Sequence, residues 1–300
     1  MNIAVLGAGA WGSAIASSFA AAECTPQHRV TLWGREADVI TQLRRDGINH
    51  RYLPNIPLNA ALQYSDDLNH TLSTHAAPDY LLILATPIAG LRDISRKIAT
   101  HSQQTNGTRA AVIWLCKGVE RDTHLFPHQI VSAELPPKIP FGVLSGPSFA
   151  QEVAKKLPCA LVLASAFDAL DLSFVQKLSN PYLRIYHSSD VIGVELGGAH
   201  KNVLAIAAGI SDGLKLGMNA RAALLTRGIA EMRRFANALG ANPDTISGLT
   251  GVGDLILTAT GDLSRNRTVG LQLATGKALH DISASLSHVA EGALCAHAML

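Results

Sequence analysis

The chain opens with Ile3-Ala4-Val5-Leu6-Gly7-Ala8-Gly9-Ala10-Trp11-Gly12, which predicts a strand, a glycine turn and the start of a helix. The four apolar residues suit a buried strand, and the Ala/Ser-rich residues that follow, to about Ala22, suit a helix. In the spacing G-x-G-x-x-G, Gly7 allows a tight turn, Gly9 lets the backbone approach a pyrophosphate and Gly12 lets the helix pack on the strand. The phosphates would lie at the helix N-terminus, where N–H groups and the helix dipole attract anions. The opening therefore predicts a dinucleotide-binding fold.

Length and composition narrow the classes of protein that fit. The 300 residues are enough for two domains, since a single core rarely grows beyond about 250–300 residues. The chain is 48% hydrophobic and 16% charged, which predicts a compact globular protein, and its net charge of +2 gives no reason to expect nucleic acid as a partner. The four cysteines are far apart, so we expect no disulfide framework, no zinc site and a cytoplasmic location. No signal peptide is expected, because Met1-Asn2-Ile3 lacks a basic start, and no membrane span is expected, because no apolar run reaches about 18 residues.

Strand-like runs alternate with helical stretches through the first 188 residues. The runs lie at residues 3–6, 29–33, 62–64, 80–85, 110–115, 141–144, 160–164 and 183–186. Several are continuously apolar, which is typical of parallel strands buried on both faces. A helix is expected over 36–45 and a turn over 52–55. This alternation predicts a Rossmann-like, doubly wound α/β sheet domain spanning residues 1–188.

Polar or flexible residues follow three of these strands. They are Thr86-Pro87, Cys116-Lys117-Gly118 and Ser145-Gly146-Pro147-Ser148. Open α/β sheets bind ligands at the carboxyl ends of their strands, so these turns predict a site along that edge. Lys117 would face a cofactor or an anionic substrate there, although a surface lysine is an equal alternative. Ser148 is expected chiefly to cap the next helix, with neighbouring N–H groups left for a ligand.

The end of the second strand bears on the choice of cofactor. An acidic residue at this place bonds the ribose 2′-hydroxyl in folds that prefer NAD, whereas an arginine suits a 2′-phosphate. Here the chain reads Gly34-Arg35-Glu36. Arg35 favours NADPH, while Glu36 keeps NADH open, and a solvated loop charge is the alternative interpretation of Arg35.

From Val191 onward helical periodicity replaces the strand-like runs. Apolar residues at 225, 229, 232, 236 and 239 repeat at spacings of four and three, which predicts one buried stripe on a long helix. Gly240 follows as a C-cap. Residues 189–300 are therefore predicted to form an all-helical, substrate-binding domain.

One lysine and one asparagine stand in the small, apolar stretch 195–203 of this domain. Desolvation disfavours the charged form of Lys201 and would lower its pKa, so Lys201 is a candidate acid or anion ligand. A lysine that snorkels to solvent is the alternative. Asp254, in a glycine-rich stretch, would pair with Lys201, since an unpaired carboxylate there would be costly.

Ser264-Arg265-Asn266-Arg267 predicts an anion site. Ser264 suits an N-cap, and basic residues in the first turn of a helix are unfavourable unless an anion binds there too. Phosphate is the natural candidate, and an exposed basic turn is the alternative. His124 and His128 have helical spacing for a metal, but no third ligand is apparent, so no metal is expected.

Taken together, these motifs resemble the bacterial NAD(P)-dependent sn-glycerol-3-phosphate dehydrogenases. The matching segments are GAGAWG at Gly7, LWGR ending at Arg35, YLP at Tyr52, KG at Lys117, SGPSFA at Ser145, ELGGAHKNV at Glu195, NARAAL at Asn219, GVGDL at Gly251, LSRNR at Leu263 and VAEG at Val289. The resemblance implies reversible reduction of dihydroxyacetone phosphate to sn-glycerol 3-phosphate with NADPH or NADH, which would feed glycerophospholipid synthesis.

The resemblance also implies roles for individual residues. Lys201 resembles the general acid that protonates the developing alkoxide, and Lys117 and Asp254 complete the catalytic set. Residues that resemble substrate contacts are Lys117, Gly146, Ser148, Lys201, Asn202, Asp254, Ser264, Arg265 and Asn266. Residues that resemble cofactor contacts are Gly7, Gly9, Ala10, Trp11, Gly12, Arg35, Lys117, Ala150, Arg265, Val289 and Glu291.

Three features depart from the family pattern. His200 stands where the family more often has an apolar residue, which would perturb Lys201, and Ile88 stands where a serine is common. The sequence ends at Leu300, soon after VAEG, where relatives usually continue for another helix or so. We therefore expect the second domain to be less stable or to depend on oligomerisation, with a homodimer as the candidate assembly.

Two other functions fit parts of the pattern. A β-hydroxyacid dehydrogenase of the same two-domain plan also pairs a glycine loop with a later lysine and asparagine, but a carboxylate substrate would not need the LSRNR cradle. A dinucleotide-sensing module would not need Lys117, Lys201 and Asp254 together.

Overall fold

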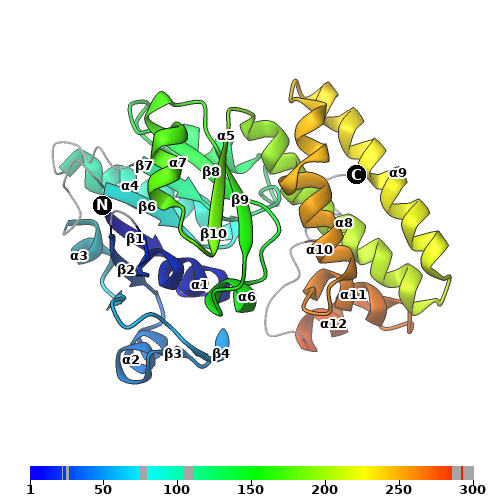
Figure 1. The fold of residues 1–300 in the computed structure, drawn as a ribbon, viewed down its shortest axis with the longest axis horizontal. Helices are drawn as coiled ribbons and strands as arrows, with labels where there is room; N and C mark the ends of the chain where they lie inside the picture. Colours follow the sequence, from blue (N-terminus) through cyan, green and yellow to red (C-terminus); the bar gives the residue numbers. More distant parts are fainter. Residues whose placement is uncertain (22, 25–26, 74–79, 105–110, 286–291, 293–300) are drawn as a thin grey trace. The chain divides into compact units, whose positions relative to one another are not determined.

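The computed structural model describes residues 1–300 except for 22, 25–26, 74–79, 105–110, 286–291 and 293–300 (Figure 1). The chain forms two compact units. The first comprises Met1–Cys116, Pro127–Leu144 and Ser148–Ser189, and the second comprises Lys117–Phe126, Ser145–Pro147 and the chain from Asp190 onward. The segments 117–126 and 145–147 thus group with the second unit although they precede residue 189, and Phe126 packs against its hydrophobic core. The division into continuous domains at residue 189 stays a prediction.

The first unit is built on an eight-stranded sheet with the order β10-β9-β8-β7-β6-β1-β2-β5. The strands are β1 (Asn2–Leu6), β2 (Arg29–Trp33), β5 (Gln63–Ser65), β6 (Tyr80–Leu84), β7 (Ala111–Trp114), β8 (Phe141–Ser145), β9 (Cys159–Ala164) and β10 (Leu183–Ser188). The pairings of β1 with β2 and with β6 are parallel. The order reverses direction at β1, which confirms the predicted doubly wound fold and marks the switch point where such folds bind ligands.

Helices cover both faces of this sheet. They are α1 (Ala10–Phe19), α2 (Ala37–Asp46), α3 (Leu68–Ser73), α4 (Ile88–Gln104), α5 (Pro127–Glu134), α6 (Ala150–Ala154) and α7 (Leu172–Leu178), with a 3₁₀ turn η1 (Asp168–Leu170). Consecutive residues of a strand face opposite sides, yet Ile3, Ala4, Val5 and Leu6 are all fully buried. The continuous apolar runs of the sequence therefore reflect a sheet packed on both sides.

The turn predicted over 52–55 is wrong. The chain forms a short antiparallel hairpin instead, with β3 (Ile48–Asn49) paired to β4 (Leu53–Pro57) and the turn before Leu53. The prediction followed the turn-forming Pro54 and Asn55, and Asn55 does adopt a left-handed φ of 62°. The strand persists because Leu53 and Ile56 are buried in the core of the unit.

The second unit is helical, as predicted. It contains α8 (Val191–Gly213), α9 (Met218–Ala238), a 3₁₀ turn η2 (Pro243–Ser247), a π-helical turn η3 (Leu249–Gly253), α10 (Asp254–Thr260), α11 (Arg265–Leu273) and α12 (Leu279–Ser285). Among the described residues, no helix is long and apolar enough to cross a membrane.

The predicted apolar stripe on α9 is only partly correct. Met232 and Ala236 are fully buried, but Leu239 is 44% exposed. The helix ends at Ala238, and Gly240 turns the chain away with a φ of 75°, so Leu239 no longer follows the helical stripe.

Two glycines bring the backbones of α8 and α11 into direct contact. A Cβ atom on Gly209 would lie 2.2 Å from the carbonyl oxygen of Arg267, and one on Gly270 would lie 2.1 Å from that of Ile206. Only glycine permits this approach. The crossing fixes the start of α11 against α8, and both helices carry predicted site residues.

Candidate active site

Lys201 lies in the middle of α8, where only 7% of it is exposed. Its Nζ donates hydrogen bonds to Oδ1 of Asp254 at 2.7 Å and to Oγ1 of Thr258 at 2.8 Å. Asp254, the first residue of α10, is 1% exposed. The predicted pairing is therefore present, and Lys201 does not snorkel to solvent.

Lys117 joins this pair from the segment that follows β7. Its Nζ donates to Oδ2 of Asp254 and to the carbonyl oxygen of Gly146 at 3.2 Å. Burial raises the pKa of the Asp254 carboxyl, but the charges and hydrogen bonds of the two lysines outweigh burial and hold that pKa below its ordinary value. Two ammonium groups around one carboxylate leave one net positive charge, which favours an anionic substrate.

Thr258 belongs to this group, although the sequence analysis did not single it out. Its hydroxyl lies one helical turn beyond Asp254, to whose carbonyl oxygen it donates at 2.7 Å, and it accepts from Lys201. The available signal was the spacing of four residues from Asp254, which places both side chains on one face of α10. Ser145, which stands in a predicted strand-end turn without a predicted contact of its own, is 3% exposed, and its Oγ has no hydrogen-bond partner among the described residues.

A chain of amides orients Asn202, the next residue on α8. The backbone N–H of Gly292 donates to Oδ1 of Asn266 at 3.2 Å, and Nδ2 of Asn266 donates to Oδ1 of Asn202 at 2.9 Å. The Nδ2 of Asn202 is buried and has no acceptor within the described part of the chain. A buried donor normally has a partner, so this one suits an oxygen atom of a ligand.

The start of α11 has the geometry expected of the predicted anion site, which stays a prediction. Ser264 is its N-cap and accepts a hydrogen bond from the N–H of Arg267 at 3.2 Å. Arg265 is exposed, and in the described residues it forms no ion pair. A guanidinium beside a helix N-terminus suits a phosphate.

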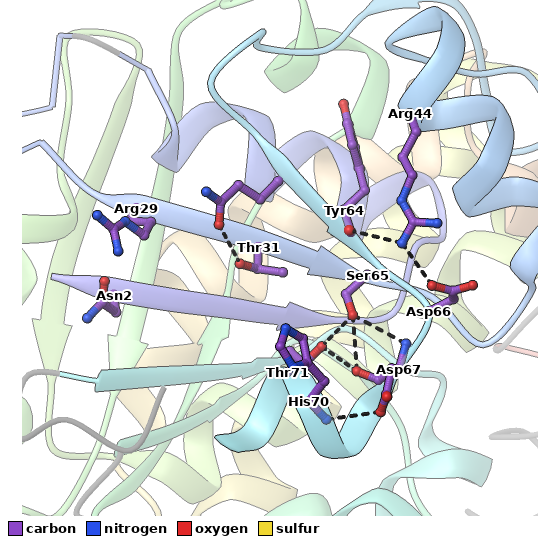
Figure 2. A pocket seen from close by; sticks show the side chains of 11 residues that line it. Asn2, Arg29, Thr31, Arg44, Tyr64, Ser65, Asp66, Asp67, His70 and Thr71 are labelled. Carbon is purple, nitrogen blue, oxygen red and sulfur yellow. Dashed lines mark hydrogen bonds and ion pairs between the residues drawn. The ribbon is translucent and has the colours of Figure 1, made fainter. Parts of the chain in front are cut away.

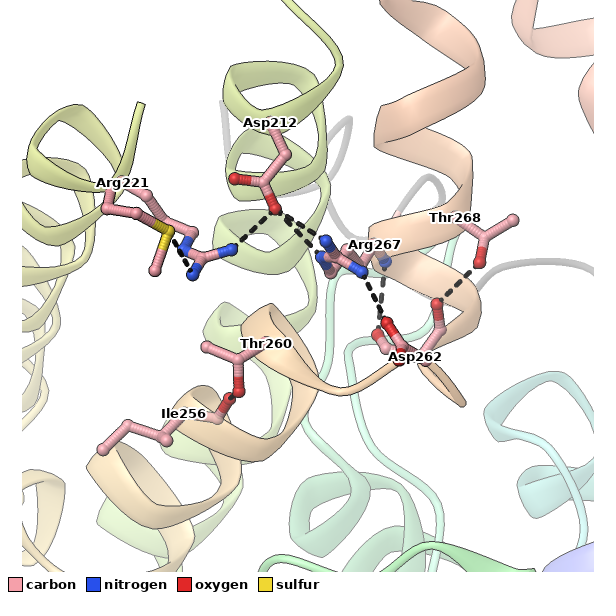
Figure 3. A network of polar contacts seen from close by, with 9 residues as sticks. Asp212, Arg221, Ile256, Thr260, Asp262, Arg267 and Thr268 are labelled. Atoms are coloured by element: carbon pink, nitrogen blue, oxygen red, sulfur yellow. Dashed lines mark hydrogen bonds and ion pairs between the residues drawn. The ribbon is translucent and has the colours of Figure 1, made fainter. Parts of the chain in front are cut away.

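Arg267 has a different role, which Figure 3 shows. Its Nε and Nη2 donate to Oδ2 of Asp212 on α8 at 3.0 and 2.9 Å, and Nη1 of Arg221 donates to the same oxygen at 2.8 Å. This network ties α8, α9 and α11 together. Of the two arginines in LSRNR, only Arg265 is therefore available to a ligand.

The glycine loop of the first unit fits a pyrophosphate. A Cβ on Gly12 would lie 1.9 Å from the carbonyl oxygen of Gly7, so α1 is in contact with the loop that follows β1. A Cβ on Gly9 would meet nothing within 4 Å, which leaves open space above the N-terminus of α1. No side chain caps this helix and its first turn contains no acidic residue, so its N–H groups suit the phosphates. Ala10 and Trp11 form the first turn of α1.

The predicted role of Ser148 as the cap of the helix after β8 is wrong. Ser148 does not occupy the N-cap of α6, because the helix begins at Ala150 and Phe149, in extended conformation, takes that position.

Val289 and Glu291 lie outside the described residues, so their predicted cofactor contacts stay predictions.

Arg35 lies at the surface of the sheet unit, and His200 is buried in the helical unit. Arg35 is exposed just after β2, beside the N-cap of α2, and forms no ion pair with any described residue. The ring of His200 packs against Phe235 of α9, with 5.3 Å between the ring centroids. Burial lowers the pKa of His200, and the nearby charge of Glu231 opposes that shift.

Figure 2 shows a polar hollow near the edge of the sheet. None of its lining residues is a predicted site residue. Arg44 there donates to Oδ1 of Asp66 at 2.8 Å and to the carbonyl oxygen of Tyr64 at 3.3 Å. This pairing gives no indication of a ligand.

A doubly wound sheet with an open glycine loop, together with a helical unit that holds buried lysines and a candidate anion site, is typical of two-domain, dinucleotide-dependent dehydrogenases. Comparison with known families narrows this class. Residues 2–170 match the model of the N-terminus of NAD-dependent glycerol-3-phosphate dehydrogenase, and residues 190–300 match that of its C-terminus. The chain belongs to this family.

Individual relatives agree with the family match. A glycerol-3-phosphate dehydrogenase (NAD(P)+) of Burkholderia orbicola (strain MC0-3) is 54% identical over 301 residues, which cover 100% of this chain and 88% of the relative. One of Ralstonia nicotianae is 51% identical over 303 residues, covering 100% and 87%. The crystal structure of glycerol-3-phosphate dehydrogenase from Coxiella burnetii has a TM-score of 0.89 at 37% identity and covers 99% of this chain and 87% of that one. A ketopantoate reductase from Ralstonia eutropha, at 15% identity and a TM-score of 0.57, shares the fold alone.

Proposed function

We propose that this chain catalyses the reversible reduction of dihydroxyacetone phosphate to sn-glycerol 3-phosphate with NADPH or NADH. The observation that carries the proposal is the buried set of Lys201, Asp254 and Lys117 in the same helical unit as the anion site of α11. Reduction of this substrate requires a proton donor for the carbonyl oxygen and a binding site for the phosphate.

Lys201 acts as the proton donor. A bound nicotinamide cofactor would supply the hydride, and reduction places negative charge on the carbonyl oxygen of the substrate. The Lys201 ammonium stabilises that charge and passes a proton to it. Asp254 and Thr258 hold the ammonium in place through bonds of 2.7 and 2.8 Å. In the reverse direction the neutral amine takes the proton from the alcohol.

The phosphate is bound by groups that the fold leaves available. Nδ2 of Asn202 offers a buried donor, while Arg265 and the N–H groups of α11 offer charge and further donors. Asn266 supports this site indirectly, since it fixes the orientation of the Asn202 amide. Binding energy from the non-reacting phosphate positions the carbonyl for reduction.

The experiment that tests this function compares two substrates that differ only in the phosphate. NADPH oxidation is measured with dihydroxyacetone phosphate and with dihydroxyacetone. We expect kcat/KM to be at least about 100-fold higher for the phosphorylated substrate, the scale of losing a charge-assisted binding group. Equal values for both substrates would rule the proposal out.

The two other functions are less well supported. Family membership does not favour a β-hydroxyacid dehydrogenase. A substrate whose only anionic group is a carboxylate beside the reacting carbon would also not require the anion site of α11. A sensing module would gain nothing from burying two lysines around one carboxylate, since desolvating such a set is costly.

We further propose a cytoplasmic location, a role in supplying glycerophospholipid synthesis, and a homodimeric assembly. The first two follow from family resemblance. The third is supported by exposed apolar side chains at the turn between α8 and α9, where Leu214, Leu216 and Met218 are 53%, 59% and 69% exposed. A second copy of the chain would cover such surface.

A further inference from the structure

The end of β2 carries a charge cluster that the site described above does not use. Glu36 is the N-cap of α2, and its Oε1 accepts a hydrogen bond from Nη1 of Arg51 at 3.0 Å. Its Oε2 accepts from the hydroxyl of Tyr52 at 2.6 Å. Nη2 of Arg51 also donates to Oδ2 of Asp38 at 2.7 Å. Both oxygens of Glu36 are therefore engaged by the hairpin that joins β3 to β4.

This hairpin is anchored to the glycine loop. Asn49 is 1% exposed, and its Nδ2 donates to the carbonyl oxygen of Ala8 at 2.9 Å and to Oγ of Ser13 at 2.8 Å. Its Oδ1 accepts from the backbone N–H of Tyr52 at 3.1 Å. The loop that carries Arg51 is thus held in a fixed position relative to the residues that suit the pyrophosphate.

The charge at the end of β2 decides whether the fold accepts a ribose with a 2′-hydroxyl or one with a 2′-phosphate. In doubly wound dinucleotide-binding folds, an acidic residue after the second strand bonds the ribose 2′-hydroxyl. The same carboxylate repels a 2′-phosphate. In this chain Glu36 stands there with both oxygens already bonded, and its charge is offset by Arg51, whose side chain is 47% exposed. Arg35 lies beside it without an ion pair among the described residues.

We propose that Arg51 is a specificity-determining residue for the cofactor. By pairing with Glu36 it neutralises the carboxylate that would repel a 2′-phosphate, and the site therefore admits NADPH as well as NADH. The inference rests on the proposed function of the first unit as a dinucleotide site. Arg51 acts through Glu36, so it is a positioning residue, and the hairpin anchored by Asn49 is part of the cofactor site.

Binding of two nucleotides without substrate tests the inference. The Kd values for 2′,5′-ADP and 5′-AMP, which differ in the 2′-phosphate, are measured by calorimetry at low ionic strength. Arg51→Ala should raise the Kd for 2′,5′-ADP about fivefold, the scale of one exposed charge near another, and change that for 5′-AMP less than about twofold. The matched control is Arg45→Ala, which removes an exposed arginine of α2 paired with Asp46.

The double variant separates the proposed cause from a structural one. Adding Glu36→Gln to Arg51→Ala should recover most of the lost affinity for 2′,5′-ADP, because the repelling carboxylate is gone. An unchanged ratio of the two Kd values in Arg51→Ala, or no recovery in the double variant, would overturn the inference. Thermal denaturation of each variant confirms folding. Failure of the proposed function is a separate result, namely no turnover of dihydroxyacetone phosphate by the unmodified chain.

Discussion

Asp254 and its two lysines show how a buried charge is tolerated in this fold. A carboxylate that is 1% exposed would be costly alone, and each ammonium partner would be costly without it. Together they compensate one another, and the excess positive charge remains for a ligand. Nδ2 of the neighbouring Asn202 and the guanidinium of Arg265 extend this pattern, because within the described residues the former has no acceptor and the latter forms no ion pair.

The first prediction concerns Lys201. Lys201→Ala should lower kcat by a factor of about 100 or more, the scale of losing a proton-transfer group, while the Kd for NADPH changes little. Steady-state kinetics and fluorescence titration of NADPH measure the two effects. Lys215→Ala, at an exposed lysine of the same unit, is the control. Near-normal turnover in Lys201→Ala would show that Lys201 is not the proton donor.

A second prediction concerns Arg35, which is expected to contact the 2′-phosphate directly. Arg35→Ala should raise the Kd for NADPH by about tenfold and leave that for NADH within about twofold, since only NADPH presents a phosphate to the guanidinium. Titration with both cofactors gives the ratio. If the ratio stays constant, Arg35 is only a solvated loop charge.

Among the elements, α8 carries most of the site, and its neighbours decide what each of its residues does. Lys201 faces α10, Asn202 faces Asn266 of α11, and His200 faces Phe235 of α9. Three successive residues of a helix point about 100° apart, so one short stretch can serve three packing partners. The glycine crossing of α8 with α11 brings the proposed anion site close to this helix.

The burial of His200, where α8 packs on α9, predicts that the free energy of unfolding depends on pH. Burial lowers the pKa of His200 in the folded chain, so the unfolded chain binds its proton more readily. The contribution of neutral His200 is therefore complete above its ordinary pKa of 6.5 and is lost as the pH falls below that value. His200→Leu should reduce the loss of unfolding free energy between pH 7 and pH 5, by at most about 1.4 kcal/mol per pH unit.

Urea denaturation at both pH values measures this effect. His280→Leu serves as the control, because the side chain of His280 is 93% exposed. The interpretation fails if the two variants show the same pH dependence as the unmodified chain.

At the scale of the whole molecule, each unit supplies one half of the chemistry. The sheet unit has the open glycine loop and the Glu36–Arg51 cluster, and the helical unit has the buried lysines and the proposed phosphate site. The segments 117–126 and 145–147 belong by their contacts to the helical unit, so the polypeptide enters that unit before the main crossing near residue 189.

The prediction at this scale is the assembly state. Light scattering should show twice the 31.7 kDa of one chain, because a second copy would cover the exposed apolar turn between α8 and α9. Met218→Glu should shift the mass toward one chain without changing the fold, as judged by circular dichroism. A mass of 31.7 kDa for the unmodified chain would contradict the homodimer.

The sequence alone determined the fold class and indicated most of the candidate site residues. Apolar runs such as Tyr80–Leu84 predict buried parallel strands, and the spacing of Gly7, Gly9 and Gly12 predicts the turn, because both patterns depend on local backbone geometry. The pairing of Asp254 with Lys201 also followed from composition, since buried charges need partners.

Only the tertiary structure decided how those residues combine. Lys117 and Asp254 are 137 positions apart, and no local pattern places their side chains on one another. Thr258, the roles of the two arginines in LSRNR, and the contact of Arg51 with Glu36 likewise depend on which elements pack together. Strand and helix patterns report on neighbours within a few residues, whereas these contacts are set by the path of the whole chain through its two units.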